Sequence, residues 1–175
     1  MIEVLRLNHR IKRDPRISTH LALVSRAFGA LKIYYSGDKD SEMENIVNKV
    51  TDEFGGPFEI EHIKDEIKFI KEKKKERFFV IHLTCYGLEI KKEIGKIKKF
   101  DNILVIVGGS KVQGEIYNLS DFNISVTNQP HSELAALTIF LDKYFDSKEL
   151  DKKFINAKSI IIPKERGKLV KKVTQ

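Results

Sequence analysis

Cysteine is almost absent from this chain, and so are long apolar runs. Cys85 is the single cysteine among 175 residues, which excludes a disulfide framework within the chain. No apolar run approaches the roughly 20 residues that an α-helix needs to span a bilayer. Charged residues interrupt the apolar ones from Glu3 onward, so the start lacks the pattern of a signal peptide. We therefore expect a soluble protein of the cytoplasm that has no membrane partner.

Two classes of catalytic site also lack support. The histidines show no paired spacing of the kind that binds zinc, and one cysteine cannot build a thiolate site, so we expect no bound metal. No serine stands in the Gly-x-Ser-x-Gly context of a hydrolase nucleophile. Cys85 follows an apolar run and is interpreted as a small core residue.

Positive charge is in excess, with 32 Lys and Arg against 25 Asp and Glu and a net charge of +7. The basic residues gather in three clusters: Arg6, Arg10, Lys12, Arg13 and Arg16; Lys71, Lys73, Lys74, Lys75 and Arg77; Lys164, Arg166, Lys168, Lys171 and Lys172. Such clusters attract polyanions, most often nucleic acid. Lys/Glu-rich surfaces also occur in proteins from hot environments. The middle cluster, interleaved with glutamates, is interpreted as a solvated helix face, whereas the arginine-rich first cluster suits phosphate recognition.

Strand and helix patterns alternate along most of the chain. Strands are predicted at 2–7, 31–35, 58–63, 78–83, 103–107 and 122–126. Helices are predicted at 18–28 with Ser18 as N-cap, at 40–54, 64–76, 90–99 and 112–118, and from 131 onward. This order predicts an α/β domain with a mainly parallel sheet flanked by helices. Residues 159–162 and 168–173 predict a β-hairpin or extended tail, so we expect one domain at 1–146 and a basic extension at 147–175.

The glycines Gly108 and Gly109 follow the buried run 103–107 and precede Lys111, as in a phosphate-binding loop. The P-loop pattern requires a Ser or Thr after the lysine, where this chain has Val112, and no G-x-G-x-x-G follows the first strand. The glycines still allow a ligand to approach the backbone. The loop therefore favours a nucleoside-type ligand without a triphosphate, or else it is only a tight turn.

The junction from Thr127 to Ser132 is rich in groups that can face a ligand. It holds two side-chain amides, two hydroxyls, a histidine and the free backbone amides of a helix start. Open α/β sheets bind small molecules at such loops after a strand's carboxyl end. The alternative is a capped turn, with Ser132 as N-cap and Pro130 setting the direction of the chain.

Three segments together resemble one known family, the archaeal tRNA cytidine-56 2′-O-methyltransferases. The segments are Leu5-Arg6-Leu7-Asn8-His9-Arg10 with the following Arg13-Asp14-Pro15-Arg16, Thr19-His20 and Arg26-Ala27-Phe28-Gly29-Ala30; Val107 to Val112; and Asn128 to Ala136. The resemblance covers almost the whole chain and is weakest between residues 64 and 99. Asn8 stands where the family pattern has glycine.

The resemblance implies a SPOUT-class methyltransferase whose sheet has a deep trefoil knot in its carboxy-terminal half. It also implies bound S-adenosylmethionine, a tRNA substrate, and a homodimer with the site at the interface. The implied cofactor residues are Leu83, Gly108, Gly109, Ser110, Lys111, Val112, Val126, Thr127, Asn128, Gln129, Pro130, His131, Ser132 and Glu133. The tRNA phosphates are assigned to Arg10, Arg13 and Arg16, with His20 beside them.

Arg26 falls where the wider class carries its catalytic arginine. An arginine is a poor base, but it can clamp a phosphate and stabilise charge that develops at a ribose hydroxyl. Its alternative role is to satisfy carbonyls at a helix C-terminus. His20 could assist proton transfer or fill a capping role. Two other functions stay open: methylation of another RNA position, and RNA binding without catalysis.

Overall fold

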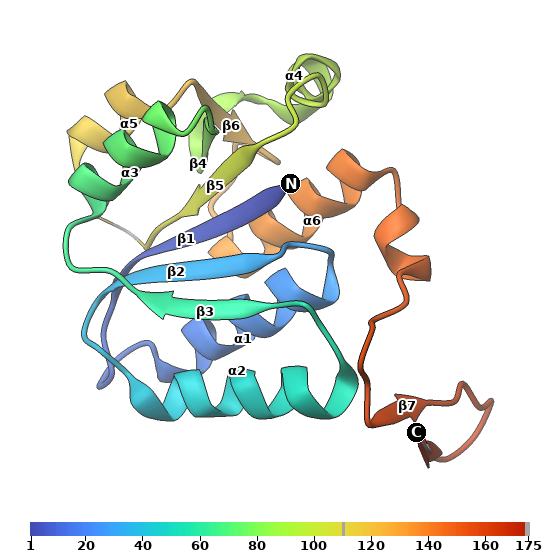
Figure 1. The fold of residues 1–175 in the computed structure, drawn as a ribbon. Helices are drawn as coiled ribbons and strands as arrows, with labels where there is room; N and C mark the ends of the chain where they lie inside the picture. Colours follow the sequence, from blue (N-terminus) through green and yellow to red (C-terminus); the bar gives the residue numbers. More distant parts are fainter. Residues whose placement is uncertain (110, 174–175) are drawn as a thin grey trace.

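A six-stranded sheet forms the centre of the protein (Figure 1). The structure is a computed structural model that describes residues 1–109 and 111–173, with Pro15 described in its backbone only. Across the sheet the strands are β3 (Glu59–His62), β2 (Lys32–Gly37), β1 (Ile2–His9), β5 (Ile103–Val107), β4 (Phe79–Glu89) and β6 (Phe122–Ser125). Every neighbouring pair runs parallel, which confirms the predicted α/β fold with a parallel sheet.

Helices cover both faces of this sheet. One face carries α1 (Pro15–Ala27), α2 (Ser41–Phe54), α4 (Ile90–Ile97) and α6 (Glu133–Phe145), and the other carries α3 (Glu66–Lys75) and α5 (Gly114–Leu119). Because both faces are covered, strand side chains on both sides are apolar. In β1, Ile2 and Val4 face the α1 and α6 side, while Leu5 and Leu7 face α3 and α5.

Local signals explain where the helices begin and end. The Asp40 carboxylate accepts from the Met43 amide at 2.9 Å and caps α2. Gly29 follows α1 with a φ of +92°, a conformation that suits glycine. The prediction that Ser18 caps α1 is wrong, because the helix begins one turn earlier at a proline. Ser18 instead lies buried inside the helix.

Strand β4 continues past its predicted end and bends around β6. Leu83 and Leu88 both pair with Ile124, so the intervening residues loop out around that strand. A Cβ on Gly87 would lie 2.5 Å from the backbone of Asn123, so only glycine allows this close approach. The crossing segments are thus held backbone against backbone.

The last part of the chain lies outside the sheet. A 3-10 helix, η1 (Lys148–Asp151), leads to β7 (Ser159–Ile161) and β8 (Val170–Lys172), which pair antiparallel. Lys158 and Lys172 form ion pairs with Asp52 and Glu53 on α2, at 2.6 Å each. The extension is therefore anchored on the end of α2.

One charged residue departs from the sequence prediction for the middle basic cluster. Lys73 is 8% exposed, and its ammonium lies 2.8 Å from Glu3 and 3.1 Å from Glu76. It therefore belongs to a buried ion-pair network, whereas Lys71 and Lys75 on the same helix are exposed. Within residues 1–109 and 111–173, no helix has both the length and the apolar character needed to cross a membrane.

Candidate functional site

The carboxyl ends of β4 and β5 border a cavity of about 400 Å³, which we call the central cavity. Its lining is His82, Leu83, Thr84, Cys85, Tyr86, Gly108, Gly109, Val112, Tyr117, Pro130, His131, Glu133 and Ala136. These residues come from the end of β4, the loop after β5, α5 and the start of α6. The two loops singled out in the sequence therefore meet at one site, as expected for an open α/β sheet.

The structure brings only part of the predicted cofactor set to this cavity. Leu83, Gly108, Gly109, Val112, Pro130, His131 and Glu133 line it. Val126, Thr127 and Asn128 line a separate cavity of about 220 Å³ beside the start of α4. Lys111 lines another cavity, described below as the basic cavity, and Gln129 is exposed and lines none of the cavities described here. Ser110 lies outside the described residues, and Ser132 caps α6 by accepting from the Ala135 amide, as predicted.

The Asn128 side chain forms hydrogen bonds with the loop at residues 84–87 of β4. Its amide donates to the carbonyl of Cys85 at 2.8 Å and to that of Gly87 at 3.1 Å. The Asn128 side chain thus holds the β4 loop in place instead of facing the central cavity, and a contact of Asn128 with the cofactor stays a prediction. The predicted core role of Cys85 is wrong, because Cys85 is half-buried and lines the cavity wall.

Sequence reasoning missed the aromatic and imidazole part of the central cavity. His82 is 1% exposed; its Nδ1 lies 2.9 Å from the Asn123 side-chain oxygen, and its ring packs edge-on against Tyr117. Burial lowers the pKa of His82, although the Asn123 hydrogen bond opposes that effect. The ring is therefore neutral at neutral pH. A polar residue within the apolar run 78–83 was the signal available in the sequence.

A second cavity lies beside the central one, and Gly109 lines both. We call it the basic cavity; its volume is about 490 Å³. Its lining is Arg6, Asn8, His9, Arg10, Arg13, Gly37, Asp38, Gly109 and Lys111. Arg10 pairs with Asp14 at 2.9 Å, and this hydrogen bond lowers the pKa of the Asp14 carboxyl. The remaining cations give the cavity a positive character.

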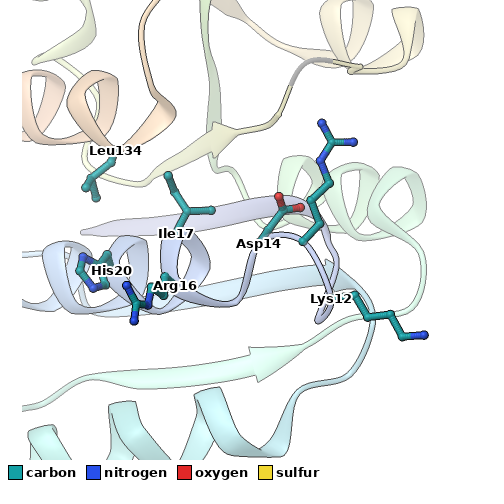
Figure 2. A pocket seen from close by; sticks show the side chains of 7 residues that line it. Lys12, Asp14, Arg16, Ile17, His20 and Leu134 are labelled. Carbon is teal, nitrogen blue, oxygen red and sulfur yellow. The ribbon is translucent and has the colours of Figure 1, made fainter.

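A third cavity of about 450 Å³ opens between the starts of α1 and α6, and we call it the helix cavity (Figure 2). In Figure 2, Leu134 of α6 lies opposite Ile17 of α1, and Arg16 lies beside His20. The predicted substrate residues are thus divided, with Arg10 at the basic cavity, His20 and Arg16 at the helix cavity, and Arg13 lining both. All of them are exposed and can meet a large polyanion.

A buried histidine fixes the basic loop between β1 and α1. The His9 ring, with 0% exposed surface, lies 2.8 Å from the Ser18 hydroxyl and 3.1 Å from the Asp40 carboxylate. These residues have the composition of a hydrolase triad, but the 2% exposure of Ser18 keeps substrate away from it. The arrangement instead ties the loop to the starts of α1 and α2.

Arg26 lies at the opposite end of α1 from these cavities and lines none of them. It is 6% exposed, its Nε and Nη2 donate to the Gly55 carbonyl, and its guanidinium covers the Phe154 ring at 4.4 Å. Burial lowers the pKa of this guanidinium. The structure therefore does not bring Arg26 to the pocket of its own chain, and a catalytic role for it stays a prediction that needs the pocket of a second chain.

Metal ligands do not gather at these cavities. Among residues 1–109 and 111–173, no group of three or more His, Cys, Asp and Glu side chains lies close enough to hold a metal ion.

The amino-acid sequence is similar to those of known tRNA methyltransferases over most of its length. Residues 54–171 match the family described as tRNA ribose 2′-O-methyltransferase, aTrm56. The tRNA (cytidine(56)-2′-O)-methyltransferase of Methanocaldococcus jannaschii is 51% identical over 97% of this chain and 96% of its own length. The protein of that name from Thermococcus kodakarensis is 47% identical, with the same two coverages. A relative from Picrophilus torridus is 53% identical over 98% of this chain, which spans only 49% of that longer protein.

Solved structures share the fold at much lower identity. The A. aeolicus TrmH/SpoU tRNA modifying enzyme has a TM-score of 0.62 and 16% identity, over 86% of this chain and 76% of its own. The SpoU methyltransferase AviRb from Streptomyces viridochromogenes, solved in complex with AdoMet, has a TM-score of 0.58 and 12% identity, over 85% and 57%. The sheet with its flanking helices is thus that of the SpoU and TrmH enzymes. With the sequence match over most of its length, the chain belongs to the tRNA ribose 2′-O-methyltransferase family aTrm56.

Proposed function

We propose that this protein transfers the methyl group of S-adenosylmethionine to the ribose 2′-hydroxyl of cytidine 56 in the T loop of tRNA. The observation that carries the proposal is the 51% identity to the Methanocaldococcus jannaschii enzyme of that name over nearly the full length of both chains. The meeting of Gly108, Gly109 and Glu133 in one cavity also supports it, because these residues come from two segments that resemble the family and lie apart in the sequence.

The central cavity fits S-adenosylmethionine in size and chemistry. Leu83, Val112 and Ala136 give apolar walls, and Tyr86 and Tyr117 add aromatic surface. The backbone at Gly109 is open, because a Cβ there would approach nothing closer than 4.0 Å. The Glu133 carboxylate supplies negative charge toward a cationic ligand. When bound, the cofactor supplies a methyl group on a positively charged sulfonium.

The exposed basic residues would hold the tRNA. Arg10, Arg13 and Arg16 stand on the loop and first turn that join β1 to α1, beside His20. Arginine forms bidentate hydrogen bonds with phosphate, and clustered cations attract RNA from a distance. Because His9 ties this loop to both helices, the backbone that carries these cations is held in place before tRNA arrives, while their side chains stay exposed. The loop would orient the ribose above the central cavity.

The knot and the domain division belong to the same proposal. The wrapping of residues 84–87 around β6, with Asn128 bonded to the wrapping loop, supports a trefoil knot in the carboxy-terminal half. We assign residues 1–146 to the methyltransferase domain and 147–175 to a basic extension, because the sheet and its covering helices end at Phe145. We also propose that the protein acts on tRNA in the cytoplasm.

A homodimer would explain two further features. Apolar side chains on the extension are exposed to solvent, for example Ile161, which is 69% exposed, and Val170, which is 53% exposed. A second chain that packs against them would bury this surface. Arg26 could serve as the catalytic arginine only in the pocket of a second chain. Light scattering on the purified protein, measured with and without tRNA, tests the dimer.

The experiment that tests the activity uses unmodified tRNA transcripts and radiolabelled S-adenosylmethionine. We expect incorporation of one methyl group per tRNA, and none into a transcript with 2′-deoxycytidine at position 56. Equal incorporation into both transcripts would contradict the assigned target.

A further inference from the structure

Arg6 is a buried cation with unused donors. It is 1% exposed on β1, and its Nη2 lies 3.1 Å from the Glu133 carboxylate. Its Nε and Nη1 are buried and have no hydrogen-bond partner among the residues that the structure describes. Burial lowers the pKa of the Arg6 guanidinium although Glu133 opposes that effect. An unpaired buried donor on a charged group lowers the stability of the fold. A ligand that accepts hydrogen bonds from these donors would remove that cost.

The Arg6 side chain forms part of the wall of the basic cavity, with its unused donors buried behind that wall. Arg6 lines this cavity, and its Nη1 lies 4.0 Å from the position that a Cβ on Gly109 would take. Arg10, Arg13 and Lys111 line the same cavity. Of the acidic residues nearby, Asp38 accepts from the Ile11 amide, Asp14 pairs with Arg10, and Glu133 uses only Nη2 of Arg6. Positive charge therefore exceeds negative charge around the cavity.

This charge and shape suit one phosphate group. A planar guanidinium presents adjacent donors that match two oxygens of a phosphate, and the match is stronger where water is excluded. Arg6 is also held before any ligand binds, because β1 lies between β2 and β5 and Glu133 fixes Nη2. Little side-chain entropy is then lost on binding. The exposed arginines of the loop lack this restraint.

We propose that the basic cavity binds one phosphodiester next to the ribose that is methylated, with Arg6 Nε and Nη1 as the buried donors. The inference rests on the proposed function and assigns a position to the substrate. Gly109 lines both this cavity and the central one, so a phosphate held here places the adjoining ribose at the mouth of the central cavity. Arg6 is a positioning residue: it binds the phosphate, and the bound phosphate places the adjoining ribose.

The pairing with Glu133 connects the two ligands. Glu133 lines the central cavity and bonds Arg6, so one ion pair borders both cavities. A cofactor in the central cavity and a phosphate in the basic cavity would each fix one member of this pair. Binding of S-adenosylmethionine is then expected to strengthen tRNA binding, and by reciprocity tRNA strengthens cofactor binding by the same factor.

The test removes the charge of single phosphates. Ligated tRNAs carry 2′-deoxycytidine at position 56, to prevent turnover, and one neutral methylphosphonate on either side of that nucleotide. The nucleotide on the 5′ side of every methylphosphonate is also 2′-deoxy, because its 2′-hydroxyl would otherwise cleave the neutral linkage. A third tRNA carries the methylphosphonate in the anticodon stem as control. With S-adenosylmethionine present, we expect neutralisation of one flanking linkage to weaken binding to the unaltered protein about 10- to 100-fold, as loss of a charge-assisted contact does. The anticodon-stem control should bind like unmodified tRNA.

An Arg6→Lys variant assigns that loss to Arg6. Lysine keeps a charge for Glu133 but lacks the planar fork. We expect this variant to bind unmodified tRNA less tightly and to be clearly less sensitive to the neutral linkage, because its point charge replaces two directed hydrogen bonds. Lys75→Gln, an exposed charge removal on α3, should keep the full sensitivity. A folded Arg6→Lys variant with the same sensitivity as the unaltered protein would overturn the assignment.

The unaltered protein decides the matter even if Arg6→Lys fails to fold. Equal affinity for both flanking neutral linkages and for unmodified tRNA would overturn the phosphate site while the proposed function stands. Failure of the unaltered protein to methylate unmodified tRNA would overturn the proposed function and this inference with it.

Discussion

The guanidinium of Arg26 lies 4.4 Å from the centroid of the Phe154 ring. The same group donates through Nε to the Gly55 carbonyl at 3.1 Å, so one buried side chain joins the end of α1, the turn after α2 and the segment after η1. Gly56 and Ile155 pair as an isolated bridge at the same place. The segment after η1 is therefore attached to the rest of the chain at the end of α1 that lies away from the cavities.

This contact predicts a stability defect for Arg26→Ala. The change removes hydrogen bonds from a charged donor and a cation–π contact, which together contribute about 2–4 kcal/mol. We expect a lower thermal unfolding midpoint, with Phe154→Leu giving a smaller part of the same loss. Unaltered stability in Arg26→Ala would contradict the anchoring role. Turnover measured on the folded variant at low temperature then tests catalysis separately, since loss of a charge-stabilising donor costs about 10²–10³-fold.

Replacement of Gly109 should separate cofactor binding from folding. A Cβ at Gly109 meets no atom closer than 4.0 Å, so Gly109→Val can fold, but its side chain would occupy the space between the two cavities. We expect cofactor affinity, measured by isothermal titration, to fall at least about tenfold with an unchanged unfolding midpoint. Gly95→Val on α4 is the matched control, because nothing lies within 4 Å of a Cβ there. Normal cofactor binding by folded Gly109→Val would remove this loop from the site.

The pattern of apolar residues was sufficient to predict the sheet. The strand predicted at Ile103–Val107 is confirmed with the same bounds. A short, continuous apolar run is typical of a strand in a sheet that is covered on both faces. The start of α1 was mispredicted because Ser18 has the chemistry of an N-cap, whereas its hydroxyl is used by His9. The spacing of apolar residues indicates which face of a helix is buried. It does not indicate which residue far away in sequence forms a hydrogen bond with a given hydroxyl.

The site was predictable where backbone signals dominate and not where side chains cross between segments. Gly108 and Gly109 lie at the cavity as expected from the loop after a buried strand. The hydrogen bonds of the Asn128 side chain could not be predicted, because their acceptors, the carbonyls of Cys85 and Gly87, lie 43 and 41 positions away in sequence. Arg6 was counted only as part of a basic cluster, because nothing in the sequence indicates that it is buried.

His82 predicts a pH dependence of stability. Its pKa is lowered by burial in the folded protein, whereas the unfolded chain has the ordinary value of about 6.5. The unfolded state therefore binds more protons as the pH falls below about 6.5, and the folded state loses stability until its own lower pKa is reached. In His82→Gln, this part of the slope should disappear in denaturant titrations between pH 7 and pH 5. The same slope in both proteins would contradict the burial of this imidazole.

The exposed arginines predict a salt-dependent contribution to tRNA affinity. Replacing Arg10, Arg13 and Arg16 together by Gln removes up to three phosphate contacts, so the slope of log K against log salt should flatten by about two to three. Cofactor affinity should stay near that of the unaltered protein, because none of the three lines the central cavity. Replacing Lys75 and Lys99, both exposed, serves as the charge control. An unchanged slope in the arginine variant would remove this loop from the tRNA contact.

The most direct measurement of the central claim is a map of the methylated nucleotide. Unmodified tRNA is incubated with the protein and S-adenosylmethionine, digested with a base-specific nuclease, and sequenced by tandem mass spectrometry. We expect one added methyl group, located on the ribose of cytidine 56. A methyl group on a base, on another ribose, or on no nucleotide at all would contradict it.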